Sequence, residues 1–498
     1  MKKDFQLFVR FDSLYNNKTQ KRLKKFFSCG IICNINQALE VSFTAANKKK
    51  SFYLSTTQVI LLSFLAVILL GSALLSLPLS SADGKAVPYI DALFTATTAT
   101  CVTGLVTVPT FSSWSIFGQA VILILIQIGG LGIVTVMTGL MLLLNRKMGI
   151  GDKLLIQDAF NLNTMSGLSS FVKKVLIGTL IIETLGAALY MTVFIPDFGI
   201  RGIWISVFTS VSAFCNAGID IIGEDSLSGY ATNPTVNAVT CFLIIIGGIG
   251  YIVWWDVLRV IKSRASRNRR IFKPLTLHTK LAVVATLVFI FAGAALILIF
   301  EYNNPQTIGH MSLLDKIQVS LFQSVTTRTA GFATVPQQNL TNASSILSLC
   351  LMFVGGSPVG TAGGVKTVTV MVLMCSALST VRSKNHASIF NRTLSADSIR
   401  KAVAVVSVFA VIMLSSVILL AVATDAATLD IIYEAVSATA TVGLSRNLTP
   451  NLNTFGKTVI IVTMYLGRVG PISLAIALGG KPKNQNLIFD PTEDISIG

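Results

Sequence analysis

The stretch FTATTATCVTG, residues 94–104, recurs in altered form three more times along the chain. The later copies read FTSVSAFCNAG at 208–218, FQSVTTRTAG at 322–331 and YEAVSATATVG at 433–443. Each copy begins at an aromatic residue, is rich in small and hydroxyl-bearing residues and ends at a glycine, and the four final glycines are 114, 113 and 112 residues apart. This nearly constant period indicates a fourfold internal duplication.

The composition is that of a membrane protein. Mean hydropathy is +0.72, and hydrophobic residues make up 52% and charged residues 12% of the 498 residues, which is outside the range of an ordinary soluble domain. Apolar runs long enough to cross a ~30 Å hydrocarbon core as helix lie at 56–77, 115–144, 174–195, 234–258, 280–300, 343–380, 402–424 and 454–478. We therefore predict an all-α polytopic membrane protein with eight membrane spans.

The repeated segments are too short to cross a bilayer as helix, at ~1.5 Å per residue. Non-helical backbone at membrane depth is tolerated only where it is buried in protein or lines a water-filled path. We therefore expect four pseudo-symmetric helix/re-entrant pore loop/helix repeats around one central pore. The predicted repeats are 51–146, 174–262, 279–383 and 400–480, flanked by a basic cytoplasmic N-terminal extension, 1–50, and a cytoplasmic C-terminal tail, 481–498.

A second glycine marker keeps step with the first. The later span of each repeat contains a glycine cluster, beginning at Gly129, Gly247, Gly355 and Gly467. Small residues at such positions allow close helix packing in lipid. We adopt that interpretation for the first two clusters.

The net charge is +17, and the charged residues are distributed as in a membrane protein. Basic residues gather in the loops at 145–173, 259–280 and 382–401, whereas the alternate loops carry acids such as Asp220 and Asp425. The positive-inside rule then places both termini in the cytoplasm, and we expect no nucleic acid partner. The sequence contains no P-loop, no metal-ligand cluster and no Ser/His/Asp arrangement in the membrane region, so we do not expect an enzyme.

The glycine ends of the loops suit a K+ filter, in which rings of backbone carbonyls replace the hydration shell of the ion. Glycine permits the backbone angles that point several carbonyls the same way. The short helices would also aim their negative C-terminal ends at the ion. The predicted filter residues, with K+ as the transported ion, are Val102, Thr103, Gly104, Asn216, Ala217, Gly218, Thr329, Ala330, Gly331, Thr441, Val442 and Gly443.

Four motifs resemble one family. They are Thr100-Cys101-Val102-Thr103-Gly104-Leu105, Phe214-Cys215-Asn216-Ala217-Gly218, Thr327-Arg328-Thr329-Ala330-Gly331-Phe332 and Ala440-Thr441-Val442-Gly443-Leu444. Over about residues 52–480 the chain is similar to the Trk/Ktr/HKT superfamily of K+ transporters. The two additional N-terminal spans of the Trk relatives are not among the expected runs, which favours the Ktr-type membrane subunit.

The resemblance implies a K+ uptake subunit in the bacterial cell membrane, a homodimer, and a cytoplasmic ring of nucleotide-binding regulatory subunits of the KtrA type. Sodium-selective plant members carry a serine in place of the first filter glycine, so Gly104 implies K+ selectivity. No covalent cofactor is expected. A role of Na+ as an activator is left open.

The later span of the third repeat contains the run GGSPVGTAGG at 355–364. Proline removes a backbone donor and each glycine lowers helix propensity by ~1 kcal/mol, so the run predicts a broken helix. The resemblance implies an intramembrane gating loop beneath the filter, and the alternative is a structural kink. The predicted gate residues in this run are Gly355, Gly356, Ser357, Pro358, Gly360, Thr361, Gly363 and Gly364.

Arg468 stands within the fourth glycine cluster. A guanidinium at mid-membrane costs ~2.5–3.5 kcal/mol, so it should face water or a partner. The resemblance places Arg468 beside the conduction path, as a barrier that tethers the gating loop. An ion pair with an acid such as Glu183 is the alternative, and for Lys366 a gate role and snorkelling to the cytoplasmic face both stay open.

A secondary transporter with a midplane substrate site in broken helices is the competing function. It predicts inverted repeats and one or two interrupted spans. Four same-orientation repeats, each with a re-entrant loop, favour the pore.

Overall fold

A computed structural model describes residues 55–144, 149–159, 167–223, 225–264, 272–384 and 386–470. The predicted N-terminal extension, 1–50, and C-terminal tail, 481–498, lie outside these residues. In the described part the fold is almost wholly helical, and its one sheet is a hairpin of β1 (Ser388–Ile389) and β2 (Arg392–Thr393).

Four long apolar helices form an outer set: α3 (Thr56–Leu75), α9 (Leu168–Phe198), α13 (Leu277–Glu301) and α17 (Ala396–Ala423). Serine or threonine side chains cap α3, α13 and α17 by accepting a hydrogen bond from a backbone amide of the first turn, as a helix start requires. Each is long and apolar enough to cross a membrane. Large apolar side chains stay exposed on all four, for example Leu70, Leu180, Phe291 and Val422, as expected of lipid-facing surface.

Each long helix packs against a shorter helix that follows it. These four loop helices are α4 (Tyr89–Cys101), α10 (Arg201–Cys215), α14 (Leu313–Thr326) and α18 (Thr428–Ala440). Each contains one of the repeated aromatic residues and ends before its glycine. Short helical turns follow each glycine: α5 (Thr110–Ser113), η2 (Ser228–Tyr230), η3 (Gln337–Asn339) and η4 (Thr449–Asn451).

The later helix of each unit is interrupted or ends at a glycine-rich point. α6 (Ile116–Leu131) meets α7 (Ile133–Leu143) at a bend of 99°, and α11 (Pro234–Gly248) meets α12 (Tyr251–Arg264) at 95°. In the third unit α15 (Asn342–Phe353) and α16 (Thr367–Val381) flank a non-helical stretch, and α19 (Thr454–Val469) ends at Gly470. The remaining helices are η1 (Pro78–Ser80) and α8 (Ile150–Ala159).

The first two glycine clusters show close packing and also a bend. A Cβ atom added to Gly129 would lie 2.0 Å from the carbonyl oxygen of Thr100, and one added to Gly247 would lie 2.0 Å from that of Phe214. The predicted close packing therefore brings these helices against the ends of the loop helices. The bends follow at Gly132 and Gly250, whose φ angles of 84° and 95° are left-handed and interrupt a helix.

The helix count supports a membrane protein without establishing eight spans. In the part of the chain that the structure describes, four helices meet the length and composition of a span, or six if each bent pair is one span. α15, α16 and α19 have only 12, 15 and 16 residues, and the glycine-rich run at 355–364 separates the first two. Eight spans and the repeat boundaries therefore stay predictions.

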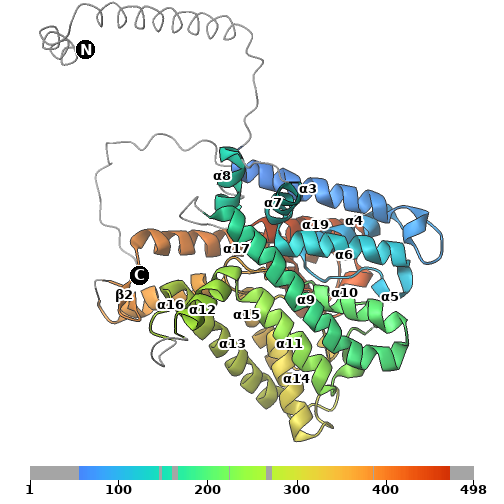
Figure 1. Cartoon of the computed structure of the whole chain (residues 1–498). Helices are drawn as coiled ribbons and strands as arrows, with labels where there is room; N and C mark the ends of the chain where they lie inside the picture. The colour runs from blue at the N-terminus through green and yellow to red at the C-terminus, as the bar shows by residue number, and fades with distance from the viewer. Residues whose placement is uncertain are drawn as a thin grey trace, which may run out of the picture. The chain divides into compact units, whose positions relative to one another are not determined.

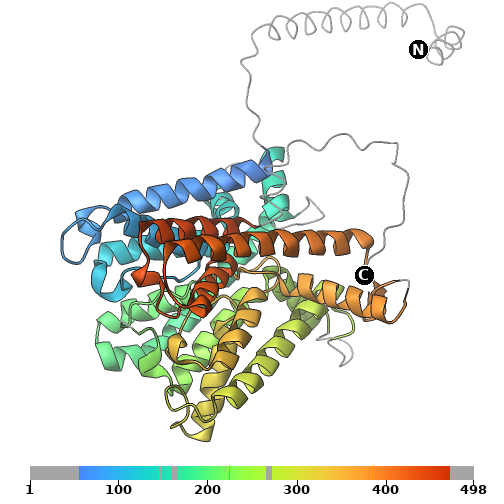
Figure 2. The same ribbon diagram turned by 180° about the vertical axis from the view of Figure 1, so that it is seen from behind.

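The helix contacts follow a cyclic order. α6 contacts α10, α11 contacts α14, α15 contacts α18, and α19 returns to α4. Figure 1 labels all of these helices except α18, and Figure 2 shows the red C-terminal helices beside the blue N-terminal ones. The closing contact includes an ion pair of 2.6 Å between Lys457 Nζ on α19 and Asp91 Oδ1 on α4. The ends of the four loop helices are thus brought together.

Candidate functional site

The four loop helices end in the same way. Val102, Asn216, Thr329 and Thr441 follow the helices with φ angles of 55°, 60°, 63° and 51°. Three of these residues are β-branched, and a left-handed conformation is unfavourable for them unless the surroundings hold it. The site thus begins with four left-handed backbone turns, three of which are strained.

Hydrogen bonds hold these turns. In the first unit the amides of Val102 and Thr103 donate to the carbonyls of Ala99 and Thr98, and the second and fourth units repeat the pattern. In the third unit the amide of Ala330 donates instead to Thr326, at 2.9 Å. That helix end is one residue tighter, which explains why Phe322 lies nine rather than ten residues before its glycine.

The four glycines meet at one point. A Cβ atom added to Gly104 would lie 3.3 Å from the Cα atoms of both Gly218 and Gly443. One added to Gly331 would lie 3.1 Å from the Cα of Gly218 and 3.3 Å from that of Gly443. Their φ angles are all positive, between 64° and 99°. Backbone angle and close approach both require glycine here.

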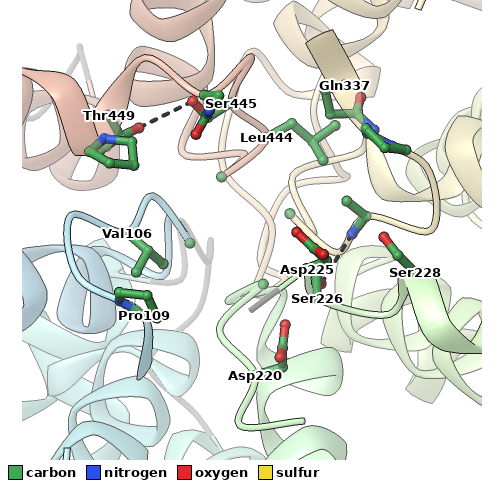
Figure 3. A pocket seen from close by; sticks show the side chains of 18 of the residues that line it. Val106, Pro109, Asp220, Asp225, Ser226, Ser228, Gln337, Leu444, Ser445 and Thr449 are labelled. Atoms are coloured by element: carbon green, nitrogen blue, oxygen red, sulfur yellow. Dashed lines mark hydrogen bonds between the residues drawn. The ribbon is translucent and has the colours of Figure 1, made fainter. Parts of the chain in front are cut away.

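A cavity of about 540 Å³ opens on the glycines. Figure 3 shows Asp220 and Asp225 on one side of it and Ser445 and Thr449 on the other. Burial raises the pKa of the Asp220 carboxyl to about 6, against the hydrogen bonds from Ser226 and the backbone, which act in the opposite direction. The cavity therefore offers carboxylate and hydroxyl oxygens next to the four glycines, and such oxygens attract a cation.

The predicted gate residues of the run 355–364 lie in the non-helical stretch 354–366, which we call the gate stretch. Arg468, also predicted as part of the gate, lies near the end of α19. It bonds back on itself, with the amide of Gly355 donating to the carbonyl of Val365 at 3.0 Å. It also packs on the break in the second unit, where the amides of Ser357 and Thr361 donate to the carbonyls of Gly248 and Gly247 at 2.8 and 3.1 Å. Thirteen residues without helix are more than a kink in a continuous helix requires.

Two cations hold the carbonyls of the gate stretch. Arg468 donates to the carbonyl of Thr361 at 2.6 Å and to that of Gly129. Lys366 Nζ lies 2.5 Å from the carbonyl oxygen of Ala362. Arg468 thus contacts the gate stretch from α19, and Lys366, the last residue of the stretch, bonds within it.

Within the described residues Arg468 forms no ion pair with Glu183, which accepts a hydrogen bond of 3.1 Å from Gln127. The alternative partner considered for Arg468 from the sequence is therefore not used in this structure.

Sequence reasoning passed over Glu434. This carboxylate directly follows the aromatic residue of the fourth loop helix and is fully buried. It accepts hydrogen bonds from the hydroxyls of Ser445, at 2.7 Å, and Thr449. Its charge could have drawn attention to it, because the other three repeats carry uncharged residues at this position, namely Thr95, Thr209 and Gln323.

Apolar helices and four loops that meet beside an acidic cavity define a helical membrane protein with a candidate cation pathway. The family model TrkH, described as a cation transport protein, matches residues 22–486. The chain belongs to this family, which confirms the resemblance stated from the motifs.

Several curated relatives cover most of the chain. The Ktr system potassium uptake protein B of Bacillus subtilis (strain 168) is 38% identical, over 88% of this chain and 95% of that protein. The potassium/sodium uptake protein NtpJ of Enterococcus hirae is 36% identical, over 91% of this chain and 100% of that protein. The Ktr system potassium uptake protein B of Vibrio alginolyticus is 33% identical, over 89% and 94%.

A solved structure shares the fold. The potassium transporter TrkH from Vibrio parahaemolyticus superimposes with a TM-score of 0.66, covers 88% of this chain and 87% of its own, and is 18% identical. At that identity the likeness supports the fold alone.

Proposed function

We propose that the chain is the K+-translocating membrane subunit of a bacterial potassium uptake system. The observation that carries the proposal is the meeting of Gly104, Gly218, Gly331 and Gly443 at one point beside an acidic cavity. The names of the relatives, which are potassium uptake proteins, support K+ as the ion. The protein would be a multi-pass protein of the cell membrane with cytoplasmic termini.

In this proposal K+ enters through the cavity, where Asp220 and Asp225 attract cations. It loses water to backbone carbonyls of the filter residues, arranged as four pseudo-symmetric repeats with eight spans around one pore. The left-handed turns at Val102, Asn216 and Thr441 end helices whose negative dipole ends favour a cation nearby. The dehydrated ion is stabilised by fixed backbone dipoles, which need not reorganise as it passes.

The gate stretch is proposed to obstruct the pathway below the filter. Arg468 and Lys366 bond its carbonyls, and the proposal puts these basic side chains beside the path by which a cation leaves the filter. At low dielectric such charges oppose a passing cation strongly. Conduction then requires the gate stretch and these cations to move together.

For its partners we propose a homodimer and a cytoplasmic ring of nucleotide-binding subunits of the KtrA type. The support is the family and the word "system" in the names of relatives. Na+ as an activator is a proposal that the name of the Enterococcus relative favours. Affinity purification from native membrane tests the ring, and recovery of the chain without a nucleotide-binding partner would contradict it.

Complementation tests the function. The chain is expressed in a bacterium that lacks its own K+ uptake systems, together with its cytoplasmic partner, on low-K+ medium. We expect growth that depends on the chain. No growth, with the protein shown to reside in the membrane, would overturn the proposal.

A further inference from the structure

The gate stretch contacts the base of the filter loops directly. The four left-handed residues at this base carry different side chains: Val102 is apolar, Asn216 carries an amide, and Thr329 and Thr441 carry hydroxyls. The amide of Gly363 in the gate stretch donates to Thr329 Oγ1 at 3.0 Å. At position 363, next to the fourth loop, only glycine fits, because a Cβ atom added to Gly363 would lie 2.0 Å from Thr441 Oγ1.

Among these residues, Asn216 contacts two other segments through its side chain. The hydroxyl of Thr361 shares its proton between the carbonyl oxygen of Phe214, at 3.1 Å, and Asn216 Oδ1, at 3.2 Å. The Nδ2 atom of Asn216 donates to the carbonyl oxygen of Arg328 at 3.3 Å. Arg328 directly precedes Thr329, the turn residue of the third loop. One side chain of the second loop therefore joins the gate stretch to the third loop.

The groups in this chain of contacts are buried. Asn216 is 1%, Thr361 0% and Arg328 6% exposed. A buried polar group that loses its partner carries the full cost of desolvation, so it follows its partner or finds another. Movement of Thr361 alone would therefore cost Asn216 a buried hydrogen bond.

We propose that Asn216 links the gate to the selectivity filter: release of Thr361 from Asn216 opens the gate stretch and at the same time loosens the third filter loop. The inference rests on the proposed function, since it needs the loops to be a filter and the stretch to be a gate. It adds a coupling residue that also explains why the base of the second loop carries an amide. Gate position and ion discrimination then change together.

The hydroxyl of Thr361 can be removed without touching its other bonds. The backbone amide of Thr361 donates to Gly247 and its carbonyl accepts from Arg468. Thr361→Val keeps the shape and both backbone bonds, and removes only the bond to the second loop. Thr361→Ser keeps the hydroxyl and is the matched control.

The test measures tracer flux of Rb+ and Na+ in proteoliposomes that hold the purified chain without a cytoplasmic partner. For Thr361→Val we expect cation flux to rise about fivefold, as for the loss of one buried hydrogen bond, and the preference for Rb+ over Na+ to fall. For Thr361→Ser we expect both quantities to return to the wild-type values. This pattern would support the link.

A rise in flux with unchanged preference would overturn the link, and so would no change in either quantity. If Thr361→Val does not elute as a folded protein in size-exclusion chromatography, Thr361→Ala removes the same hydroxyl with less bulk and is judged by the same two readouts. A wild-type chain that carries neither Rb+ nor K+ when its cytoplasmic partner is present would instead overturn the proposed function.

Discussion

The guanidinium of Arg468 donates a hydrogen bond of 2.6 Å to the carbonyl oxygen of Thr361, and so ties the end of α19 to the gate stretch between α15 and α16. A second bond from the same guanidinium reaches the carbonyl of Gly129 on α6. The first, third and fourth units thus meet at one side chain. A planar fork of donors suits this role better than an ammonium.

Replacing Arg468 with Gln should raise K+ flux. The change removes a positive charge next to the proposed pathway and the bonds that hold Thr361. Loss of a buried charged hydrogen bond corresponds to roughly a tenfold or larger shift in the gate equilibrium. The measurement is K+ uptake by cells that lack other K+ systems.

Arg468→Lys is the control, because it keeps the charge and loses the forked geometry. We expect intermediate flux for it. If Arg468→Gln reached the membrane at normal level and carried less K+ than the wild type, the tether role would be wrong.

Replacing Gly104 with Ser should weaken discrimination between K+ and Na+. The φ angle of Gly104 is 99°, and a Cβ atom there would lie 2.6 Å from the carbonyl oxygen of Ala217. The side chain must displace an oxygen proposed to bind the ion. Competition of Na+ with K+ uptake measures the effect.

Gly84→Ser is the matched control for backbone strain. Gly84 also has a positive φ, 67°, but no atom lies within 4 Å of an added Cβ. We expect unchanged selectivity for this variant. Equal selectivity of Gly104→Ser and the wild type would remove the filter assignment.

Features of the fold that depend on residue type alone were predictable from the sequence. The four loop glycines could be predicted, because only glycine readily combines a left-handed backbone with close approach of neighbouring backbone. The broken helix at 355–364 was predictable too, since it combines proline with many glycines. The bends at Gly132 and Gly250 were not, because one glycine in a helix serves packing or bending equally well.

Hydrogen-bond partners that depend on how distant segments pack together could not be predicted from the sequence. For Arg468 the sequence left an ion pair with Glu183 as the alternative to a contact with the gating loop. Its partners are the carbonyls of Thr361 and Gly129, and carbonyls leave no mark in a sequence. The bridge from Asn216 to Arg328 joins residues 112 positions apart. It depends on how the second and third loops approach each other.

Acidification of the outer solution should raise the apparent Km for K+. Burial raises the pKa of Asp220 from its ordinary value to about 6. The carboxylate is therefore ionised above about pH 6 and loses its charge as the pH falls through that value. Between about pH 7 and pH 5 we expect roughly a two- to threefold rise in the apparent Km, from weaker attraction of cations into the cavity.

Asp220→Asn should show the higher apparent Km at both pH values. Asp83→Asn, at an exposed acid that does not line the cavity, should keep the pH response of the wild type. A wild-type apparent Km that does not change with pH would contradict the role of Asp220 in attracting cations.

Breaking the ion pair between Asp91 and Lys457 should lower the stability of the protein strongly. The side chains of the pair are only 9% and 14% exposed, and the charged atoms lie 2.6 Å apart. It joins the first loop helix to the last described helix, so it closes the cyclic order of contacts. Removing one member of a buried pair leaves an uncompensated charge and costs about 3–5 kcal/mol.

Asp91→Asn should therefore lower the thermal unfolding temperature of the purified protein markedly, and the double change Asp91→Asn with Lys457→Met should recover part of that loss. The pair of Asp397 and Lys401, 61% and 68% exposed, is the control, because exposed pairs contribute about 1 kcal/mol or less. Equal effects of breaking the two pairs would show that the closing contact does not depend on the buried pair.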